Sequence, residues 1–537
     1  MIEEPLLKDN ILSNIYHNFA YWLNYDELYY YLGLGTAIII FLSFGMAAFC
    51  QGKYPPFIPE IKKEKLKIIS LLTLVLSFGV YLFSVFAANS SVFSNFDMMT
   101  IDYIDSMKQG IKGAFHKWRF TPLHGVDYNL IFAISSNTAF INIYIAFKQL
   151  LILYLLNIFL SFLESNKRLL ILAVINLVPA VFQINSTIFP EQNIAVFVLL
   201  SLILLVKYQK TSQKSCLLWF AICMNLAIYS KETVILFYFG ILLCLILQAV
   251  ISGKITLNKM LHPLSLLRQF PIELIMVVSM FVYTSGYMLL TVYGEQENRY
   301  LDTHSFFFDE ILRCYAAELI LNFIALAVML YKTVSSKRFY ILWDGLIIAS
   351  GVITAVIFYL QIAPVSDTFL SYYLYLPAMF CVAYILGECR KTYFAGLLMI
   401  ISFLYCDYQT FERYQGKDRK NVAEFITDLA KQKETFVYMQ SSESSDYKWW
   451  KIMAWSSALK YSFPDTELIL KSDFNFYKVY QREKDKFIEK RQVRFPQAGD
   501  YVLANKIIDP DYEPWGDYQI VYENKSYVIY YLKDKDD

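Results

Sequence analysis

The sequence predicts a polytopic α-helical membrane protein of about twelve transmembrane helices, followed by a small α/β domain outside the membrane. Three observations predict this fold class: the composition, a series of long apolar runs, and the positions of the basic residues between them. Of the 537 residues, 57% are hydrophobic and 18% are aromatic, and the mean hydropathy is +0.39. A soluble domain rarely turns so much apolar surface inward. The net charge of +1 gives no indication of nucleic-acid binding.

The apolar runs are each close to the roughly 20 residues that a helix needs to cross a bilayer. Only helices and closed barrels satisfy every backbone polar group in lipid, and these runs do not alternate as barrel strands do. We therefore expect helices in all of them. The predicted spans are 29–50, 67–88, 136–163, 168–188, 191–207, 214–230, 232–252, 270–293, 307–331, 339–362, 367–387 and 391–408.

Basic residues fill every second connection between these spans, for example at 53–67 and 207–214. By the positive-inside rule these connections face the cytoplasm. The other connections, among them the large loop 89–135, then face outward, as does everything after residue 408. The N-terminal segment 1–28 starts acidic and is typical of an interfacial amphipathic helix, with no cleavable signal expected.

After residue 408 the sequence becomes polar and its periodicity changes. We expect a transmembrane domain over 29–408 and an extracytoplasmic α/β domain over 409–537. Helices are predicted in RYQGKDRKNVAEFITDLAKQKE and WWKIMAWSSALKY, and strands in ETFVYMQ, TELILKS and on both sides of the polar turn in DYQIVYENKSYVIYYLK.

The outward connections carry clusters of ionisable and polar residues. Ionisable groups near lipid are costly to place, so their positions indicate function. If the topology holds, these clusters lie at one membrane face and could converge on one cavity. They are the loop 89–135 with Asp97, Asp102, Asp105 and Asp127, then Phe189-Pro190-Glu191, Ser230-Lys231-Glu232 and the segment from Asp367 to Pro377.

Such a cavity suits the transfer of a group from a lipid phosphate. A carboxylate within reach of an acceptor hydroxyl can take its proton, and cations stabilise charge on a departing phosphate. We expect Asp97 or Asp102 to be the base, whereas Asp105 and Asp127 look structural. The candidates for binding substrate are Arg119, His124, Glu191, Lys231, Glu232, Arg299 and Tyr372.

Each candidate also has a structural interpretation. A loop aspartate is usually solvated or caps a helix, and Glu191 would favour the dipole of the helix that it begins. Lys231-Glu232 could be a polar break between spans. His116 and His124 lack the helical spacing of metal ligands, and the eight cysteines lie in or beside the spans. No metal site or disulfide framework is therefore indicated.

Short motifs follow one another along the chain: the acids at Asp97 and Asp102, Arg119-Phe120-Thr121-Pro122-Leu123 with Asp127-Tyr128-Asn129-Leu130, Pro190-Glu191, Ser230-Lys231-Glu232, and YYLYLP at 372–377. In this order they resemble the GT-C class of polyprenyl-phosphate-sugar glycosyltransferases, which includes protein O-mannosyltransferases and lipid A aminoarabinose transferases. The resemblance implies an inverting transfer of a sugar from a polyprenyl-phosphate donor to a lipid, glycan or protein acceptor. It also implies a site on the outer face of a membrane, which we expect to be a bacterial inner membrane.

Two features depart from this class. Many members have adjacent acids, whereas Asp97 is followed here by Met98, so the base stays open between Asp97 and Asp102. An additional span precedes the acidic loop. Members differ in whether they need a divalent metal, so the resemblance leaves that cofactor open.

Three other functions fit parts of the sequence. A polysaccharide polymerase or ligase shares the spans and the lipid-linked donor, but usually places its largest loop late. A transporter or flippase predicts internal repeats and ionisable residues near the midplane, where the spans hold few: Lys148, Arg313, Glu318 and Asp344. A non-catalytic scaffold predicts that the acids of the loop 89–135 are dispensable.

Overall fold

The computed structural model describes residues 54–60, 74–79, 123, 126–134, 138–181, 191–253, 269–287, 308–359 and 374–413, together with parts of 421–533. The segment 1–28, the predicted first span and most of the loop 89–135 lie outside these residues. The described residues divide into two compact units, the first up to Tyr408 and the second from Gln409 onward.

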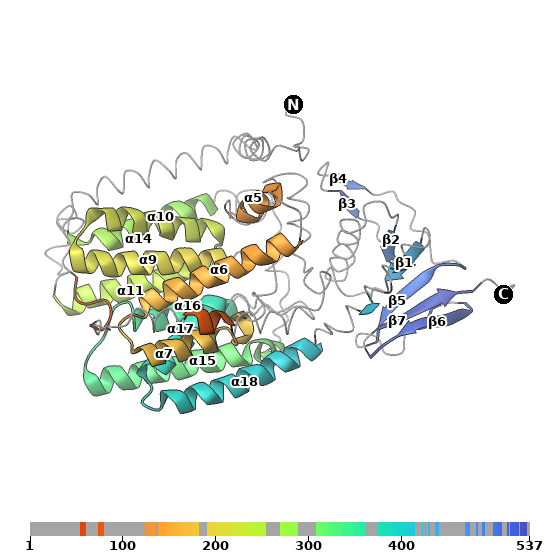
Figure 1. Cartoon of the computed structure of the whole chain (residues 1–537). Helices are drawn as coiled ribbons and strands as arrows, with labels where there is room; N and C mark the ends of the chain where they lie inside the picture. Colours follow the sequence, from red (N-terminus) through yellow and green to blue (C-terminus); the bar gives the residue numbers. More distant parts are fainter. Residues whose placement is uncertain are drawn as a thin grey trace. The chain divides into compact units, whose positions relative to one another are not determined.

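The first unit is a helical bundle (Figure 1). A described helix overlaps every predicted span from residue 136 onward. The described helices are α5 (Val126–Ile134), α6 (Thr138–Phe159), α7 (Ser165–Ile175), α9 (Glu191–Thr211), α10 (Lys214–Ser230), α11 (Val234–Ile251), α14 (Pro271–Tyr287), α15 (Phe308–Ser336), α16 (Gly345–Tyr359), α17 (Tyr375–Glu388) and α18 (Thr392–Arg413).

Three of these helices have the length and apolar composition needed to cross a membrane: Glu191–Thr211, Val234–Ile251 and Ala316–Ser336. Large apolar side chains also remain exposed on the bundle, among them Phe323 and Tyr331 of α15, which are 72% and 78% exposed. A helix that is apolar on both its packed and its outer face suits lipid better than water. The described residues thus form a mostly helical unit with membrane-compatible helices.

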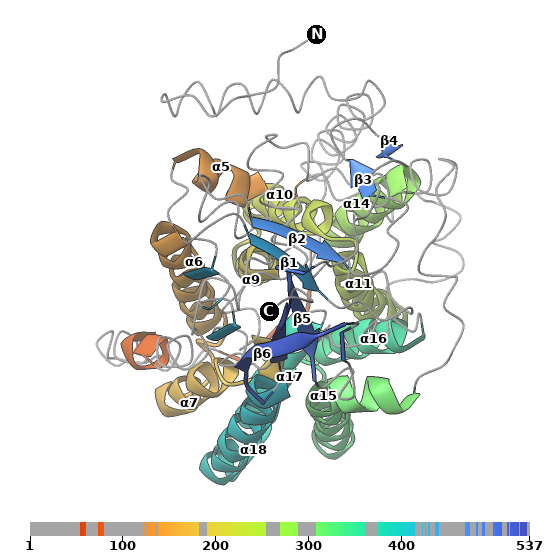
Figure 2. The same cartoon turned by 90° about the vertical axis from the view of Figure 1, so that its right-hand side faces the viewer.

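Small residues bring some of these helices close together. α9 packs against α6 and α10, and α11 packs against α16 (Figure 2). At Gly240 of α11, an added Cβ would lie 2.5 Å from the Cα of Ala349 in α16. Such close backbone approach is the usual result of small residues at helix interfaces in membranes.

The second unit contains a five-stranded sheet of order β2-β1-β5-β7-β6. β1 is parallel to β2 and β5, whereas β7 is antiparallel to β5 and β6. A separate antiparallel pair is formed by β3 and β4. The strands are β1 (Thr435–Met439), β2 (Leu468–Ser472), β3 (Val479–Gln481), β4 (Lys486–Ile488), β5 (Tyr501–Asn505), β6 (Tyr518–Glu523) and β7 (Tyr527–Leu532).

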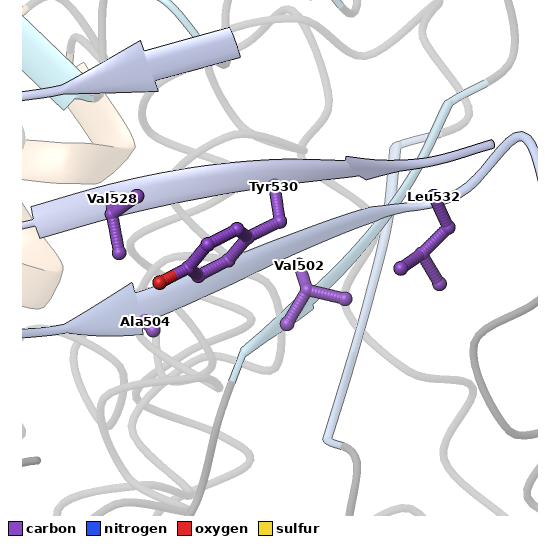
Figure 3. Close-up of a cluster of buried hydrophobic side chains, with 5 residues drawn as sticks. All are labelled: Val502, Ala504, Val528, Tyr530 and Leu532. Atoms are coloured by element: carbon purple, nitrogen blue, oxygen red, sulfur yellow. The ribbon is translucent and has the colours of Figure 1, made fainter. Parts of the chain in front are cut away.

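The predicted strands β1, β2, β6 and β7 are confirmed, but β5 and the short pair of β3 and β4 were not predicted. β5 lies inside the sheet, and Val502, Leu503 and Ala504 are all buried. The sequence of a strand that is buried on both faces is a continuous apolar run, not an alternation of apolar and polar residues. Figure 3 shows the buried side chains of β5 and β7 that form a core on one face of the sheet: Val502, Ala504, Val528, Tyr530 and Leu532.

Candidate functional site

A buried ion pair joins the start of α9 to the end of α10. Lys231 directly follows α10, and its Nζ donates a hydrogen bond to Oε1 of Glu191, the first residue of α9. The two side chains are only 2% and 6% exposed. Each charge also suits its helix end, because a carboxylate is favoured at an N-terminus and a cation at a C-terminus. Removing either partner would leave the other charge buried and uncompensated.

A pocket opens beside this pair. Its polar lining comes from Glu191, Lys231, Thr233 and Tyr375, and its remaining walls are the apolar side chains of Ile194, Val234, Ile353 and Leu376. The pocket thus brings together residues of the three predicted outward clusters that follow the loop 89–135. The second carboxylate oxygen of Glu191, Oε2, is buried and has no hydrogen-bond partner within the described structure.

A second ion pair, between the buried Lys148 and the 20% exposed Asp127, links α5 and α6. Lys148 Nζ lies 3.1 Å from Asp127 Oδ2 and donates a hydrogen bond to the Tyr128 hydroxyl at 2.7 Å. It also lies 3.9 Å from the centre of the Tyr128 ring, within the range of a cation–π contact. Asp127 Oδ2 accepts a further hydrogen bond from Tyr144 at 2.8 Å.

The first turn of α9 connects the two ion pairs. Lys148 interacts electrostatically with Glu191 as well as with Asp127, and the Asn193 side chain hydrogen-bonds to Asp127. The four charges therefore alternate in sign in the order Asp127, Lys148, Glu191, Lys231, and they sum to zero. We call these four residues the charge row.

The charge row sets the ionisation of Asp127, which lies in α5 outside the predicted spans. Burial opposes ionisation, but the Lys148 charge and the hydrogen bonds to the carboxylate outweigh it and lower the pKa of Asp127. Asp127 is therefore an anion at neutral pH. Its other oxygen, Oδ1, is buried without a hydrogen-bond partner among the described residues.

The described end of the loop 89–135 also reaches this region. The backbone N–H of Leu123, the last residue of the predicted Arg-Phe-Thr-Pro-Leu motif, donates to the carbonyl of Tyr229 at 3.1 Å. Tyr229 lies two residues before Lys231. The first outward cluster is thus tied by its backbone to the helix end that carries the pocket lysine.

A chain of polar side chains runs from the pocket into the bundle. The Tyr375 hydroxyl lies 3.5 Å from Gln149 Oε1, and Gln149 Nε2 donates to Asn176 Oδ1 at 2.9 Å. Asn176 Nδ2 in turn donates to the Ser77 carbonyl at 2.9 Å. These contacts hold Tyr375, where it lines the pocket, to α6 and to the C-terminal end of α7.

Another charge cluster lies where α15 ends and α16 begins. Lys332 Nζ lies 2.8 Å from Asp344 and 3.1 Å from Glu388 at the end of α17. Asp344 also accepts hydrogen bonds from the Tyr384 hydroxyl and the Tyr340 backbone. Because α17 begins at the pocket and ends at this cluster, the two lie at opposite ends of the bundle, as the predicted topology requires.

The predicted site residues fall into two groups. Glu191 and Lys231 form the pocket pair, and Glu232 is half-buried beside Lys231. The others lie outside the described residues, and their roles stay predictions: Asp97, Asp102, Arg119, His124, Arg299 and Tyr372. In the part of the chain that the structure describes, no three histidine, cysteine or carboxylate side chains gather as a metal ion would need.

Sequence reasoning missed the partnership of Asp127 and Lys148, and the pocket position of Tyr375. One signal was available, because a lysine inside a span needs a nearby anion or carbonyl. Lys148 is such a lysine, and its own helix offers no anion on the same face. The anion lies on the preceding helix, a pairing that no periodicity within one helix predicts.

Comparison with known proteins gives similarity to solved structures alone. No protein-family model and no curated protein matches the chain, whereas 16 chains of known structure do. Two of these are ArnT from Cupriavidus metallidurans bound to undecaprenyl phosphate, with a TM-score of 0.44, and the same protein in the apo state, with a TM-score of 0.45. In both cases the identity is 10%, and the match covers 86% of this chain and 97% of ArnT. At this identity and TM-score, any function must be argued from the residues of the site.

Proposed function

We propose that this chain is a membrane glycosyltransferase that moves a sugar from a polyprenyl-phosphate donor to a lipid, glycan or protein acceptor. The observation that carries the proposal is the Lys231–Glu191 pair, buried in a pocket at helix ends that the charge pattern predicts to face outward. A buried charged pair at helix ends that are predicted to lie at a membrane surface suits contact with the polar headgroup of a lipid.

The proposed reaction is a single displacement with inversion. The acceptor hydroxyl attacks the anomeric carbon, the bond from that carbon to the phosphate oxygen breaks, and polyprenyl phosphate leaves. A carboxylate takes the proton of the hydroxyl, and we assign this step to Asp97 or Asp102. The Asp127 carboxylate is engaged by Lys148, Tyr144 and Asn193, which suits a supporting role better than that of the base.

Lys231 is the proposed ligand of the departing phosphate. A lysine ammonium carries a positive charge and N–H donors, both of which suit contact with a phosphate oxygen. Because the charge row sums to zero, an incoming phosphate would add a net negative charge that further cations must balance. We assign that balance to Arg119 and Arg299, with His124 assisting at the same face and Glu232 and Tyr372 completing the substrate contacts.

The proposal places the site on the outer face of a bacterial inner membrane, with residues 409–537 on the same side and about twelve spans in total. Alkaline phosphatase, which is active only outside the cytoplasm, tests this when it is fused after residue 537. An active fusion is expected. An inactive fusion, together with an active cytoplasmic reporter at the same position, would reverse the topology.

Activity is tested by genetic replacement in the native host. Lys231→Met, Asp97→Asn and Asp102→Asn are introduced separately, and glycolipids and glycans are compared with those of a deletion strain. We expect Lys231→Met and one of the aspartate variants to reproduce the deletion profile while the protein still accumulates in the membrane.

Lys506→Met is the matched control. It also removes a lysine from an ion pair, but that pair, Lys506 with Glu523, is exposed in the second unit, so a wild-type profile is expected. Wild-type profiles for all three site variants, beside an altered profile for the deletion, would contradict the proposed function.

A further inference from the structure

The cations at the two ends of the helical bundle differ in exposure. At the end that holds the charge row, Lys148 and Lys231 are almost fully buried and lie in ion pairs. At the opposite end, three helix connections carry exposed cations. They are Lys207 and Lys210 near the end of α9, Lys337 and Arg338 directly after α15, and Arg390 and Lys391 directly before α18. We call these six residues the basic surface.

The connection between α9 and α10 is a fixed turn. The Thr211 hydroxyl donates to the Lys207 carbonyl at 2.8 Å, and the Gln213 backbone N–H donates to the same hydroxyl at 3.3 Å. Ser212 between them has a φ of 54°, the left-handed conformation that commonly ends a helix. No aspartate or glutamate occurs from 192 to 231. The end of α9 therefore carries its exposed cations on a well-defined backbone, without an acid in the same hairpin.

The connection between α15 and α16 is built in the same way. The Ser336 hydroxyl donates to the Lys332 carbonyl at 2.7 Å and accepts from the Arg338 backbone N–H at 3.3 Å. Lys337 between them has a φ of 52°. A hydroxyl at the last helical residue and a left-handed residue after it thus hold exposed cations at two places on this end of the bundle.

Exposed aromatic side chains lie on the same helices, closer to the middle of the bundle than the cations. Trp219 of α10 is 55% exposed, Tyr331 of α15 is 78% exposed, and Tyr393 at the start of α18 is 64% exposed. Trp219 and Tyr331 are each five residues from a helix end, which is about 7.5 Å along the helix axis. Aromatic rings just below a layer of cations are typical of the boundary between lipid headgroups and acyl chains.

We propose that the basic surface binds anionic phospholipids, of which phosphatidylglycerol is an example, in the leaflet at this end of the bundle. Its cations provide charge for the lipid phosphates, and the exposed aromatic side chains extend the contact to the glycerol and the acyl chains. A free phosphate could contact the cations alone, so the apolar extension favours a lipid. The inference does not depend on the proposed reaction, because the basic surface lies at the opposite end from the charge row.

The test measures which phospholipids the purified full-length protein retains. The protein is placed in nanodiscs that contain equal amounts of phosphatidylglycerol and phosphatidylcholine, then returned to mild detergent and separated from free lipid. The retained lipids are quantified by mass spectrometry. We expect the wild-type protein to enrich phosphatidylglycerol at least about fivefold, the factor that a single cation near an anionic lipid surface supplies.

Two double variants remove parts of the basic surface. Lys207→Gln with Lys210→Gln, and separately Arg390→Gln with Lys391→Gln, should each lower the enrichment severalfold. All four side chains are exposed, so we expect both variants to fold. Lys525→Gln with Lys533→Gln is the matched control, because it removes the same charge from exposed positions of the second unit and should keep the wild-type enrichment.

Two measurements on the wild-type protein decide the matter even if a variant does not accumulate. Raising the salt from about 0.1 M to about 1 M shortens the Debye length from about 10 Å to about 3 Å, and the enrichment should fall. An excess of free glycerol phosphate should not displace the lipid, because it lacks the apolar contacts.

Four results would overturn the inference. They are equal retention of the two lipids by the wild-type protein, an enrichment that salt does not lower, displacement of the lipid by glycerol phosphate, and an equal loss of enrichment in the control and in the two variants of the basic surface. Wild-type enrichment in both of those variants would likewise exclude the assigned residues.

Discussion

Replacing Lys148 by Met should destabilise the helical unit more than any exposed lysine substitution does. Lys148 is 4% exposed and lies 3.1 Å from Asp127 Oδ2. At an effective dielectric constant of 20, two unit charges at that distance attract by about 5 kcal/mol. Desolvation of the ammonium offsets much of this attraction. Without the ammonium, Asp127 loses its ion-pair partner but keeps its hydrogen bonds from Tyr144 and Asn193 and is 20% exposed, so we expect a loss of about 3 kcal/mol, at the lower end of the range for buried pairs.

A double-mutant cycle tests whether the pair is the cause. Asp127→Asn combined with Lys148→Met removes both charges, and neutral replacements of a buried pair are often close to neutral in stability. We therefore expect the double variant to recover most of the loss in melting temperature caused by Lys148→Met, measured by the tryptophan fluorescence of the protein in detergent. Lys506→Met serves as the exposed control, because its pair is worth at most about 1 kcal/mol.

The reasoning is refuted if Lys148→Met melts like the wild-type protein, or if the double variant loses as much as the two single variants added together. Either result would mean that Asp127 and Lys148 do not share an interaction. The alternating charges beside the pocket would then have to be described as independent groups.

Two further predictions follow from the helix contacts and the ionisation of Asp127. Gly240→Ala should lower the melting temperature by the equivalent of about 1–3 kcal/mol, because the new Cβ would lie 2.5 Å from the Cα of Ala349. Gly79→Ala is the control, because a Cβ there would meet nothing within 4 Å, and it should leave the melting temperature unchanged. Equal melting temperatures of the two variants would contradict the packing argument. The lowered pKa of Asp127 means that its carboxylate stabilises the fold fully above its unfolded pKa of about 4 and less as the pH falls through its folded pKa. The gap in melting temperature between wild type and Asp127→Asn should therefore be constant from about pH 7 to 5 and shrink below about pH 4, and a gap that widens in acid would exclude this role.

The sequence predicted the helices well because their signal is local. A run of about 20 apolar residues identifies a span without knowledge of its neighbours, and the described helices from α6 onward follow those runs. The convergence of Glu191, Lys231 and the segment containing Tyr375 could be expected for the same reason, since the alternation of basic connections assigns each helix end to a face.

The pairings that build the site were not predictable in the same way. Asp127 and Lys148 lie on different helices and meet through tertiary packing, and no spacing rule covers such a contact. β5 escaped prediction because its consecutive residues Val502, Leu503 and Ala504 are all buried, and a strand covered on both faces lacks the alternation of a half-buried one. Both misses concern contacts between segments that local patterns do not connect.

Three of the four ionisable residues that the sequence places within spans, Lys148, Glu318 and Asp344, have fixed partners in the described structure. Lys148 is paired with Asp127, and Asp344 with Lys332. Glu318 is buried and accepts a hydrogen bond from the Ala180 backbone at 3.1 Å. Groups held in this way suit a fixed scaffold better than a path along which an ion or proton moves.

The strand order of the second unit has a consequence for biosynthesis. β7 lies between β5 and β6, although it is the last of the described strands along the chain. The ribosome therefore releases β1, β2 and β5 before the strand that covers the free edge of β5 exists. During that interval the edge of β5 can pair with another chain. We expect this unit to complete its fold only after translation of Leu532, and to depend on chaperones on its side of the membrane until then.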